Sequence, residues 1–140
     1  MAIQWTDSLS VGVTEIDNQH KELFRQINVL IDACHKGKGA EAVGETLVFL
    51  DRYARMHFST EEGYMERYQY PGLDVHRRQH QEFMDNLAEI RKRFEAEGPG
   101  VHIVVITNRI LAGWLNTHIR RSDKALGDYI RGLGQAEQRG

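Results

Sequence analysis

The chain has 140 residues, a formal charge of −2, 41% hydrophobic residues and 27% charged residues, which is typical of one soluble globular domain with its own core. The small net charge gives no support for binding to nucleic acid or to an anionic membrane surface. No apolar run reaches transmembrane length, no signal-peptide pattern opens the chain, and the single cysteine, Cys34, excludes an internal disulfide. We therefore expect a cytoplasmic protein without a membrane-inserted segment.

Three glycine-containing breaks, at 36–39, 70–72 and 98–100, divide the chain into four segments of helical length. The first three segments repeat hydrophobic residues at steps of three and four, which predicts the buried stripe of an amphipathic helix. The fourth, from Val101 to Leu115, is apolar over much of its circumference. Because short connections make successive helices antiparallel, we predict an all-α, up-down-up-down four-helix bundle.

We expect one domain over residues 1–140. Residues 1–13 would form an extended N-terminal arm, and residues 14–131 would form the bundle and a short C-terminal helix. The tail at 132–140, which is rich in glycine and polar residues, would fray.

The predicted buried stripes carry polar residues that a helical core normally excludes. These residues are His20, His57, Glu61, His76, His80 and His118, and Asp123 follows just beyond the last stripe. In an antiparallel bundle their positions fall at one common end. Burying imidazole or carboxylate groups without a partner is costly, so the pattern indicates a bound metal among them.

Local spacing supports one shared site but raises a difficulty at the end of the fourth segment. His57 and Glu61 are four residues apart, as are His76 and His80, so each pair projects from one helical face. His118 and Asp123 are five residues apart, which on an ideal helix leaves them roughly 140° apart. We therefore predict an interruption or bulge around 120–122, with a short new helix capped by Ser122 or Asp123.

The donor set narrows the choice of metal. Five imidazoles and two carboxylates are too many for one tetrahedral zinc, and too rich in nitrogen for calcium or magnesium. No cysteine cluster supports an iron–sulfur site. A mixed nitrogen and oxygen set inside a helical bundle favours two first-row metals bridged by carboxylates, with iron the usual choice.

Several motifs resemble those of the single-domain bacterial members of the hemerythrin family. They are SVGV at 10–13, IDNQH at 16–20, HFSTEE at 57–62, YP at 70–71, HxxxH at 76–80, and WLNTHI at 114–119 followed by Asp123. The likeness runs from residue 3 to about residue 126, and all seven ligand positions occur in order.

The resemblance implies two irons per chain. His76, His80 and His118 would ligate one iron, and His20 and His57 the other. Glu61, Asp123 and an oxo or hydroxo group would bridge both. Five nitrogens, four carboxylate oxygens and the bridging oxygen then fill all but one position of two octahedra. The vacancy falls on the iron with two histidines, where dioxygen would bind.

The function that the resemblance implies is reversible dioxygen binding for storage, transport or delivery, and not enzymatic catalysis. The alternative is sensing of oxygen, nitric oxide or redox state through the same site, read by a separate protein partner. Nitric oxide and small anions are further candidate ligands of the open iron. Apolar walls for an oxygen pocket are expected from Leu115, Phe24, Trp114 and Ile119. Glu62 is expected at the surface or behind the ligand residues.

Overall fold

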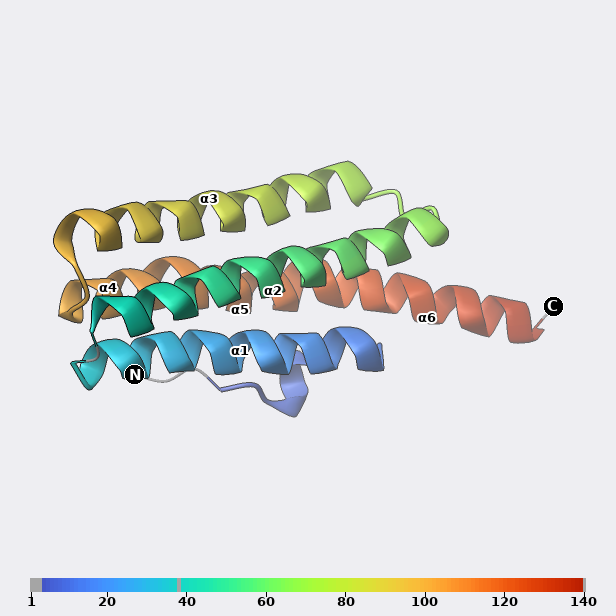
Figure 1. Ribbon diagram of the computed structural model, residues 1–140. Helices are drawn as coiled ribbons and strands as arrows, with labels where there is room; N and C mark the ends of the chain where they lie inside the picture. Colours follow the sequence, from blue (N-terminus) through green and yellow to red (C-terminus); the bar gives the residue numbers. More distant parts are fainter. Residues whose placement is uncertain (1–3, 38, 140) are drawn as a thin grey trace.

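The computed structural model describes residues 4–37 and 39–139, with side chains described as far as residue 133. Three long helices, α1 (Thr14–His35), α2 (Ala40–Arg67) and α3 (Leu73–Glu97), pack with a fourth helical column. The column consists of α4 (Val101–Ile106), η2 (Thr107–Ala112), α5 (Gly113–His118), η3 (Ile119–Asp123) and α6 (Lys124–Arg139). Successive helices run antiparallel (Figure 1), which confirms the predicted all-α four-helix bundle.

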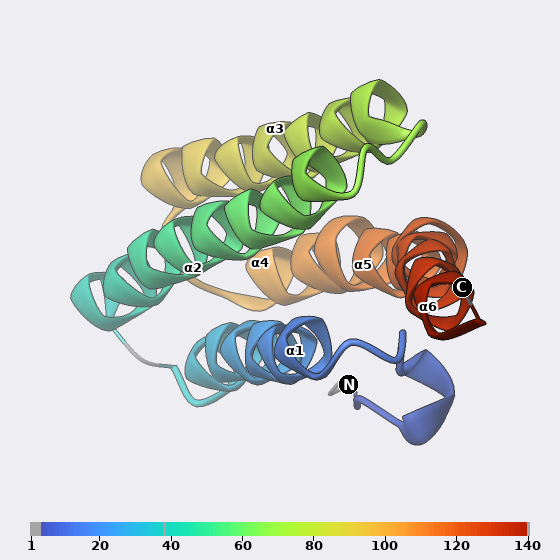
Figure 2. The ribbon, with the colours of Figure 1, turned by 90° about the vertical axis from the view of Figure 1, so that its right-hand side faces the viewer.

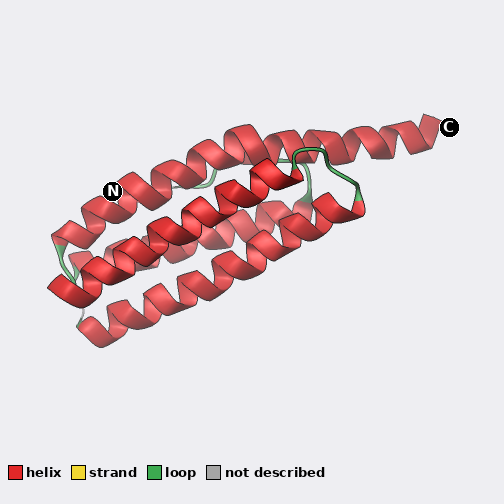
Figure 3. Ribbon diagram, turned by 90° about the horizontal axis from the view of Figure 1, so that it is seen from above, coloured by secondary structure: helices red, strands yellow, loops and turns green. Residues whose placement is uncertain are grey.

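The end-on view separates the four columns, with α1 beside the N-terminal arm and the α5–α6 column beside both (Figure 2). The helices meet at the glycine-containing breaks predicted from sequence. Gly98, for example, ends α3 with a φ of 76°, and its N–H donates to the Phe94 carbonyl at 2.7 Å. Seen from above, the bundle is helical throughout except for short connections and the arm (Figure 3).

The N-terminal arm is fastened to the start of α1. The Asp17 carboxylate accepts hydrogen bonds from the Val11 N–H at 2.8 Å and from the Ser10 hydroxyl at 2.6 Å. Val11 is fully buried, and its carbonyl lies directly against Gly127 of α6. The arm also contains one turn of 3₁₀-helix, η1 (Asp7–Leu9). Because Val11 contacts both Asp17 and Gly127, the arm connects the start of α1 with α6 at one end of the bundle.

The bulge predicted around 120–122 is confirmed, but the prediction of a new helix capped by Ser122 or Asp123 is wrong. Ile119–Asp123 form a π-helical segment, and the residues that flank it, His118 and Lys124, have α-helical angles. The Ser122 hydroxyl donates to Gln79 Oε1, so it is not engaged in capping a helix. A π-helix hydrogen-bonds residues five apart, so it accommodates the extra residue without ending the helix. A second π-segment, η2, interrupts the same column at Thr107–Ala112.

The C-terminal helix is longer than the short helix we predicted. The backbone of α6 is helical as far as Arg139. The described part of the tail that we expected to fray therefore continues the helix. In Figure 1 this extension runs past the end of the bundle.

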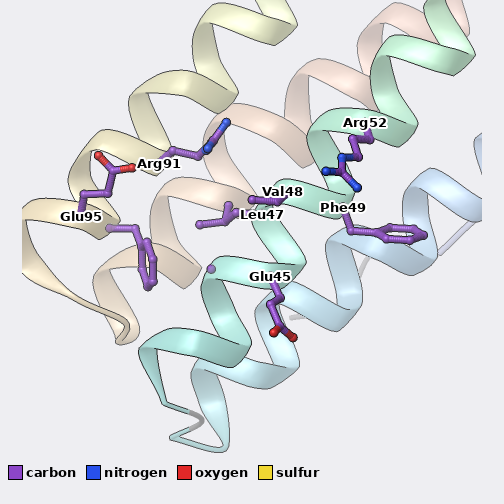
Figure 4. A pocket seen from close by; sticks show the side chains of 9 residues that line it. Glu45, Leu47, Val48, Phe49, Arg52, Arg91 and Glu95 are labelled. Carbon is purple, nitrogen blue, oxygen red and sulfur yellow. The ribbon is translucent and has the colours of Figure 1, made fainter.

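A surface groove of about 490 Å³ lies between α2 and α3. Figure 4 shows Val48, Phe49 and Arg52 on α2 and Arg91 and Glu95 on α3 around it. It follows the earlier half of α2 and the later half of α3, away from the bundle end that holds the predicted metal ligands. Among the described helices, none is long and apolar enough to cross a membrane.

Candidate metal centre

The seven residues singled out in the sequence come together inside one end of the bundle. α1 contributes His20, α2 contributes His57 and Glu61, and α3 contributes His76 and His80. His118 ends α5 and Asp123 ends η3. None of the seven is more than 5% exposed. The antiparallel topology therefore gathers residues separated by about a hundred positions into one buried cluster.

Their ligand atoms form two groups, each with all its atoms within 4.8 Å of one another. The first, which we call the three-histidine group, contains His76, His80 and His118 with both carboxylates. The second, the two-histidine group, contains His20 and His57 with the same two carboxylates. Glu61 and Asp123 therefore belong to both groups.

Glu61 divides its two oxygens between the groups. Its Oε1 lies 2.6 Å from His57 Nε2 and 3.2 Å from His20 Nε2. Its Oε2 lies 3.0 Å from His80 Nε2 and 3.2 Å from His76 Nε2. One carboxylate thus faces each group with one oxygen.

Asp123 repeats this division from the opposite side of the cluster. Its Oδ2 lies 2.9 Å from His20 Nε2, in the two-histidine group. Its Oδ1 lies 2.9 Å from His76 Nε2 and 3.1 Å from His118 Nε2, in the three-histidine group. The π-segment η3 makes this possible, because it brings a residue five positions after His118 back to the same face.

Several of these close contacts are not hydrogen bonds. His57 Nε2, His118 Nε2 and Asp123 Oδ2 are buried and have no hydrogen-bond partner, although each lies near an atom of opposite polarity. Buried polar atoms are rarely left without a partner. Nitrogen and oxygen atoms that converge in the interior without a full set of hydrogen bonds suit cations, so the residues fit a pair of metal ions.

The charges of the cluster also suit the binding of cations. Burial lowers the pKa of His20 and of His76, but the carboxylates of Asp123 and Glu61 outweigh it and raise both to about 9. Burial raises the pKa of Glu61, yet His57, His20 and His76 hold it well below its usual range. The metal-free cluster therefore retains protons that metal ions would replace.

Asp123 has the same balance of effects. Burial and the Glu61 carboxylate raise its pKa, while His118 and His20 outweigh them and keep it below the usual range. Both carboxylates are thus held ionised in the interior of the protein, as bridging ligands of cations must be.

Residues behind the cluster hold two of the imidazole rings. The Nδ1 of His57 lies 2.7 Å from the Gln19 amide oxygen, and the Nδ1 of His80 lies 3.0 Å from Glu62 Oε2. With Nε2 directed into the cluster, each Nδ1 carries the proton and donates it outward. We expected Glu62 at the surface or behind the ligands, and it lies behind His80. The sequence reasoning missed Gln19; the only signal was its place beside His20 at the edge of the buried stripe.

Aromatic rings pack on the three-histidine group. Phe58 stacks on His80 with centroids 4.0 Å apart, and Trp114 stacks on His118 at 4.4 Å, both at an interplanar angle of 14°. Of the four residues expected to wall an oxygen pocket, Phe24, Leu115 and Ile119 are buried, whereas Trp114 is partly exposed. Because Trp114 covers His118, its place in an oxygen pocket is the least supported of the four.

Comparison with known proteins agrees with this arrangement of metal-binding side chains. Residues 11–130 match the model of the hemerythrin HHE cation binding domain. The chain is 36% identical over 127 residues to the Bacteriohemerythrin of Pseudomonas paraeruginosa, covering 91% of this chain and 80% of the relative. This chain belongs to the hemerythrin family. The family is known for binding oxygen at a di-iron site.

Other members of the hemerythrin family show the same likeness. The Bacteriohemerythrin of Methylococcus capsulatus is 32% identical over 124 residues, covering 88% of this chain and 92% of the relative. The Myohemerythrin of Theromyzon tessulatum is 28% identical over 120 residues, covering 86% and 87%. A crystal structure of wild-type hemerythrin superposes with a TM-score of 0.81 at 30% identity, covering 91% of this chain and 97% of the other.

Proposed function

We propose that the cluster holds two iron ions per chain and binds dioxygen reversibly, for oxygen storage, transport or delivery. His76, His80 and His118 would ligate one iron, and His20 and His57 the other. Glu61 and Asp123, together with an oxo or hydroxo group, would bridge the two. The observation that carries the proposal is that each carboxylate directs one oxygen to each histidine group.

The unequal number of histidines supports oxygen binding at one ion only. The two-histidine group offers one nitrogen fewer than the three-histidine group, so the ion that it would hold is the one with room for a further ligand. When bound, the iron pair supplies the redox chemistry by which dioxygen is taken up and released. Nitric oxide and small anions would compete for the same position.

The protein around the cluster would keep this chemistry reversible. Five neutral imidazoles and only two carboxylates supply less negative charge than a carboxylate-rich site. Phe24, Leu115 and Ile119 belong to the buried apolar core and would supply apolar walls beside the open position. An apolar shell excludes water and proton donors, which favours release of intact dioxygen over its further reduction. We infer an oxygen-binding protein and not an enzyme.

The test is repeated oxygen cycling of iron-loaded protein. The protein is reduced without oxygen, exposed to oxygen, and returned to an inert atmosphere while its visible absorption is followed. We expect a band that appears with oxygen and disappears on its removal over several cycles, with two irons per chain. Rapid one-way oxidation would contradict reversible binding and favour sensing or catalysis. Fewer than two irons in fully loaded protein would contradict the site itself.

A further inference from the structure

The two histidine groups differ in what supports their rings from outside. In the described part of the chain, the three-histidine group has an outer carboxylate on one imidazole, and the two-histidine group has none. The difference lies outside the ligand set and concerns two residues, Gln19 and Glu62.

His57 is held by a neutral amide. Gln19 accepts at its Oε1 from His57 Nδ1 at 2.7 Å and donates through its Nε2 to the Thr60 hydroxyl at 3.3 Å. The other member of the group, His20, has a buried Nδ1 without a hydrogen-bond partner. Among the described residues, therefore, no carboxylate forms a hydrogen bond with the Nδ1 of either ring in the two-histidine group.

His80 is held by a carboxylate. Glu62 Oε2 accepts from His80 Nδ1 at 3.0 Å, and Glu62 Oε1 accepts from Arg77 Nε at 3.0 Å. Glu62 is mostly shielded, with 26% of its side chain exposed, and Phe58 stacks on the same imidazole ring. Its negative charge is therefore fixed against the outer side of His80.

An outer partner changes how strongly an imidazole donates to a metal. A carboxylate that accepts the Nδ1 proton makes the ring more basic and more electron-donating at Nε2. Stronger donation stabilises the more highly charged, oxidised state of the metal. A neutral amide fixes the orientation of the ring with a smaller effect on its basicity.

We propose that Glu62 and Gln19 are positioning residues that give the two metal sites unequal redox properties. Glu62 stabilises the ferric state of the iron held by the three-histidine group. Gln19 leaves the iron held by the two-histidine group, where the vacancy lies, easier to reduce and so easier to keep ready for oxygen. This inference rests on the proposed di-iron centre.

The test exchanges the charges of the two outer partners. Glu62→Gln removes the carboxylate from His80, and Gln19→Glu places one against His57, with almost no change in size. Glu66→Gln is the matched control. Glu66 lies four residues further along α2 and also pairs with Arg77, but among the described residues its carboxylate forms no ion pair with a ligand ring, and it is 60% exposed. The readouts are iron content and midpoint reduction potential.

We expect shifts of opposite sign. Glu62→Gln should raise the midpoint potential, and Gln19→Glu should lower it and speed spontaneous oxidation in air. Each should change the one-electron equilibrium about tenfold, which is about 59 mV. Glu66→Gln should leave the potential unchanged, and all three variants should keep two irons.

Three results would overturn the inference. The first is a potential that stays at the wild-type value in both variants, and the second is a shift of the same sign in both. The third is a loss of iron from the Glu62 or the Gln19 variant but not from the Glu66 control, which would indicate that the outer residue supports the ligand without tuning its electron donation. The proposed function fails differently, because it fails when the wild-type protein itself lacks two irons or does not release oxygen.

Discussion

At the scale of single residues, Asp123 contacts both histidine groups of the cluster. Its two carboxylate oxygens lie within 3.1 Å of Nε2 atoms of histidines from α1, α3 and α5. One side chain therefore contacts histidines from three of the four helical columns. Its oxygens face both histidine groups. A substitution there removes negative charge from both sites at once.

Asp123→Asn is expected to lose at least half of the bound iron, because a neutral amide cannot offer one anionic oxygen to each group. Iron per chain, measured after loading and desalting, checks this. Asp128→Asn is the control, since Asp128 is exposed on α6 and, among the described residues, forms an ion pair with Arg131 alone. Equal iron in both variants would rule out a bridging role for Asp123.

At the scale of elements, the π-segment η3 solves the spacing problem between His118 and Asp123. Five residues separate the pair, and a regular α-helix would turn one of them away from the cluster. The extra residue is absorbed within the turn, so α6 continues the fourth column without a break. The path of the helix and the position of the ligand are therefore coupled.

Deleting Arg120, an exposed residue of η3, should leave iron binding largely intact. The deletion shortens the spacing to four residues, and residues four apart share a face in an α-helix. Inserting one alanine after Arg120 should abolish binding at Asp123 and lower the iron content, because six residues match neither helix type. Iron analysis compares the two variants. Greater loss from the deletion than from the insertion would contradict this account of η3.

The contact between the arm and α6 gives a second prediction at this scale. A Cβ added at Gly127 would lie 2.0 Å from the Val11 carbonyl oxygen, so Gly127→Ala must displace the arm. We expect it to lower the free energy of unfolding by about 1–3 kcal/mol.

Chemical denaturation measures this loss, with Gly132→Ala in the same helix as control. Nothing lies within 4 Å of a Cβ there, so alanine should stabilise α6 by up to about 1 kcal/mol. Equal stability of the two variants would show that the arm does not pack tightly on Gly127.

At the scale of the whole molecule, the bundle surrounds a charged cluster, so its stability without metal should depend on pH. The raised pKa values of His20 and His76 stabilise the fold fully below 6.5, and this contribution is lost as the pH rises through about 9. The lowered pKa values of Glu61 and Asp123 stabilise it above 4.5, and this is lost as the pH falls.

Metal-free protein should therefore be most stable between about pH 4.5 and 6.5 and should weaken toward pH 9.5. Metal-loaded protein should not show the alkaline loss, because its imidazoles are already deprotonated as ligands. Denaturation midpoints across the pH range compare the two forms. Identical alkaline profiles would argue that the histidines do not exchange protons for metal.

Much of this molecule was predictable from sequence because its periodicity is regular. The stripes and the glycine-containing breaks located α1, α2 and α3, and the polar residues on the stripes identified the cluster. The continuity of the fourth column was not predictable, since Ser122 and Asp123 also suit a helix cap. Capping preference is a local property, whereas the π-turn depends on tertiary structure, because it places the Asp123 carboxylate inside the buried cluster.

The outer partners of the ligands were harder to predict for another reason. Gln19 and Glu62 are polar residues at the edges of amphipathic stripes, where polar residues normally face solvent. Only the packing of α1 against α2, and of α2 against α3, brings them to His57 and His80. Likewise, the stacking of Trp114 on His118 depends on ring orientation, which helical spacing does not specify.

The central claim is that two irons share Glu61 and Asp123 within one cluster. Low-temperature electron paramagnetic resonance of the fully oxidised protein, with iron counted in the same sample, tests it most directly. Bridged ferric ions couple their spins, so we expect two irons per chain and almost no signal from high-spin ferric iron. A signal from isolated ferric ions that accounts for most of the iron would contradict the claim.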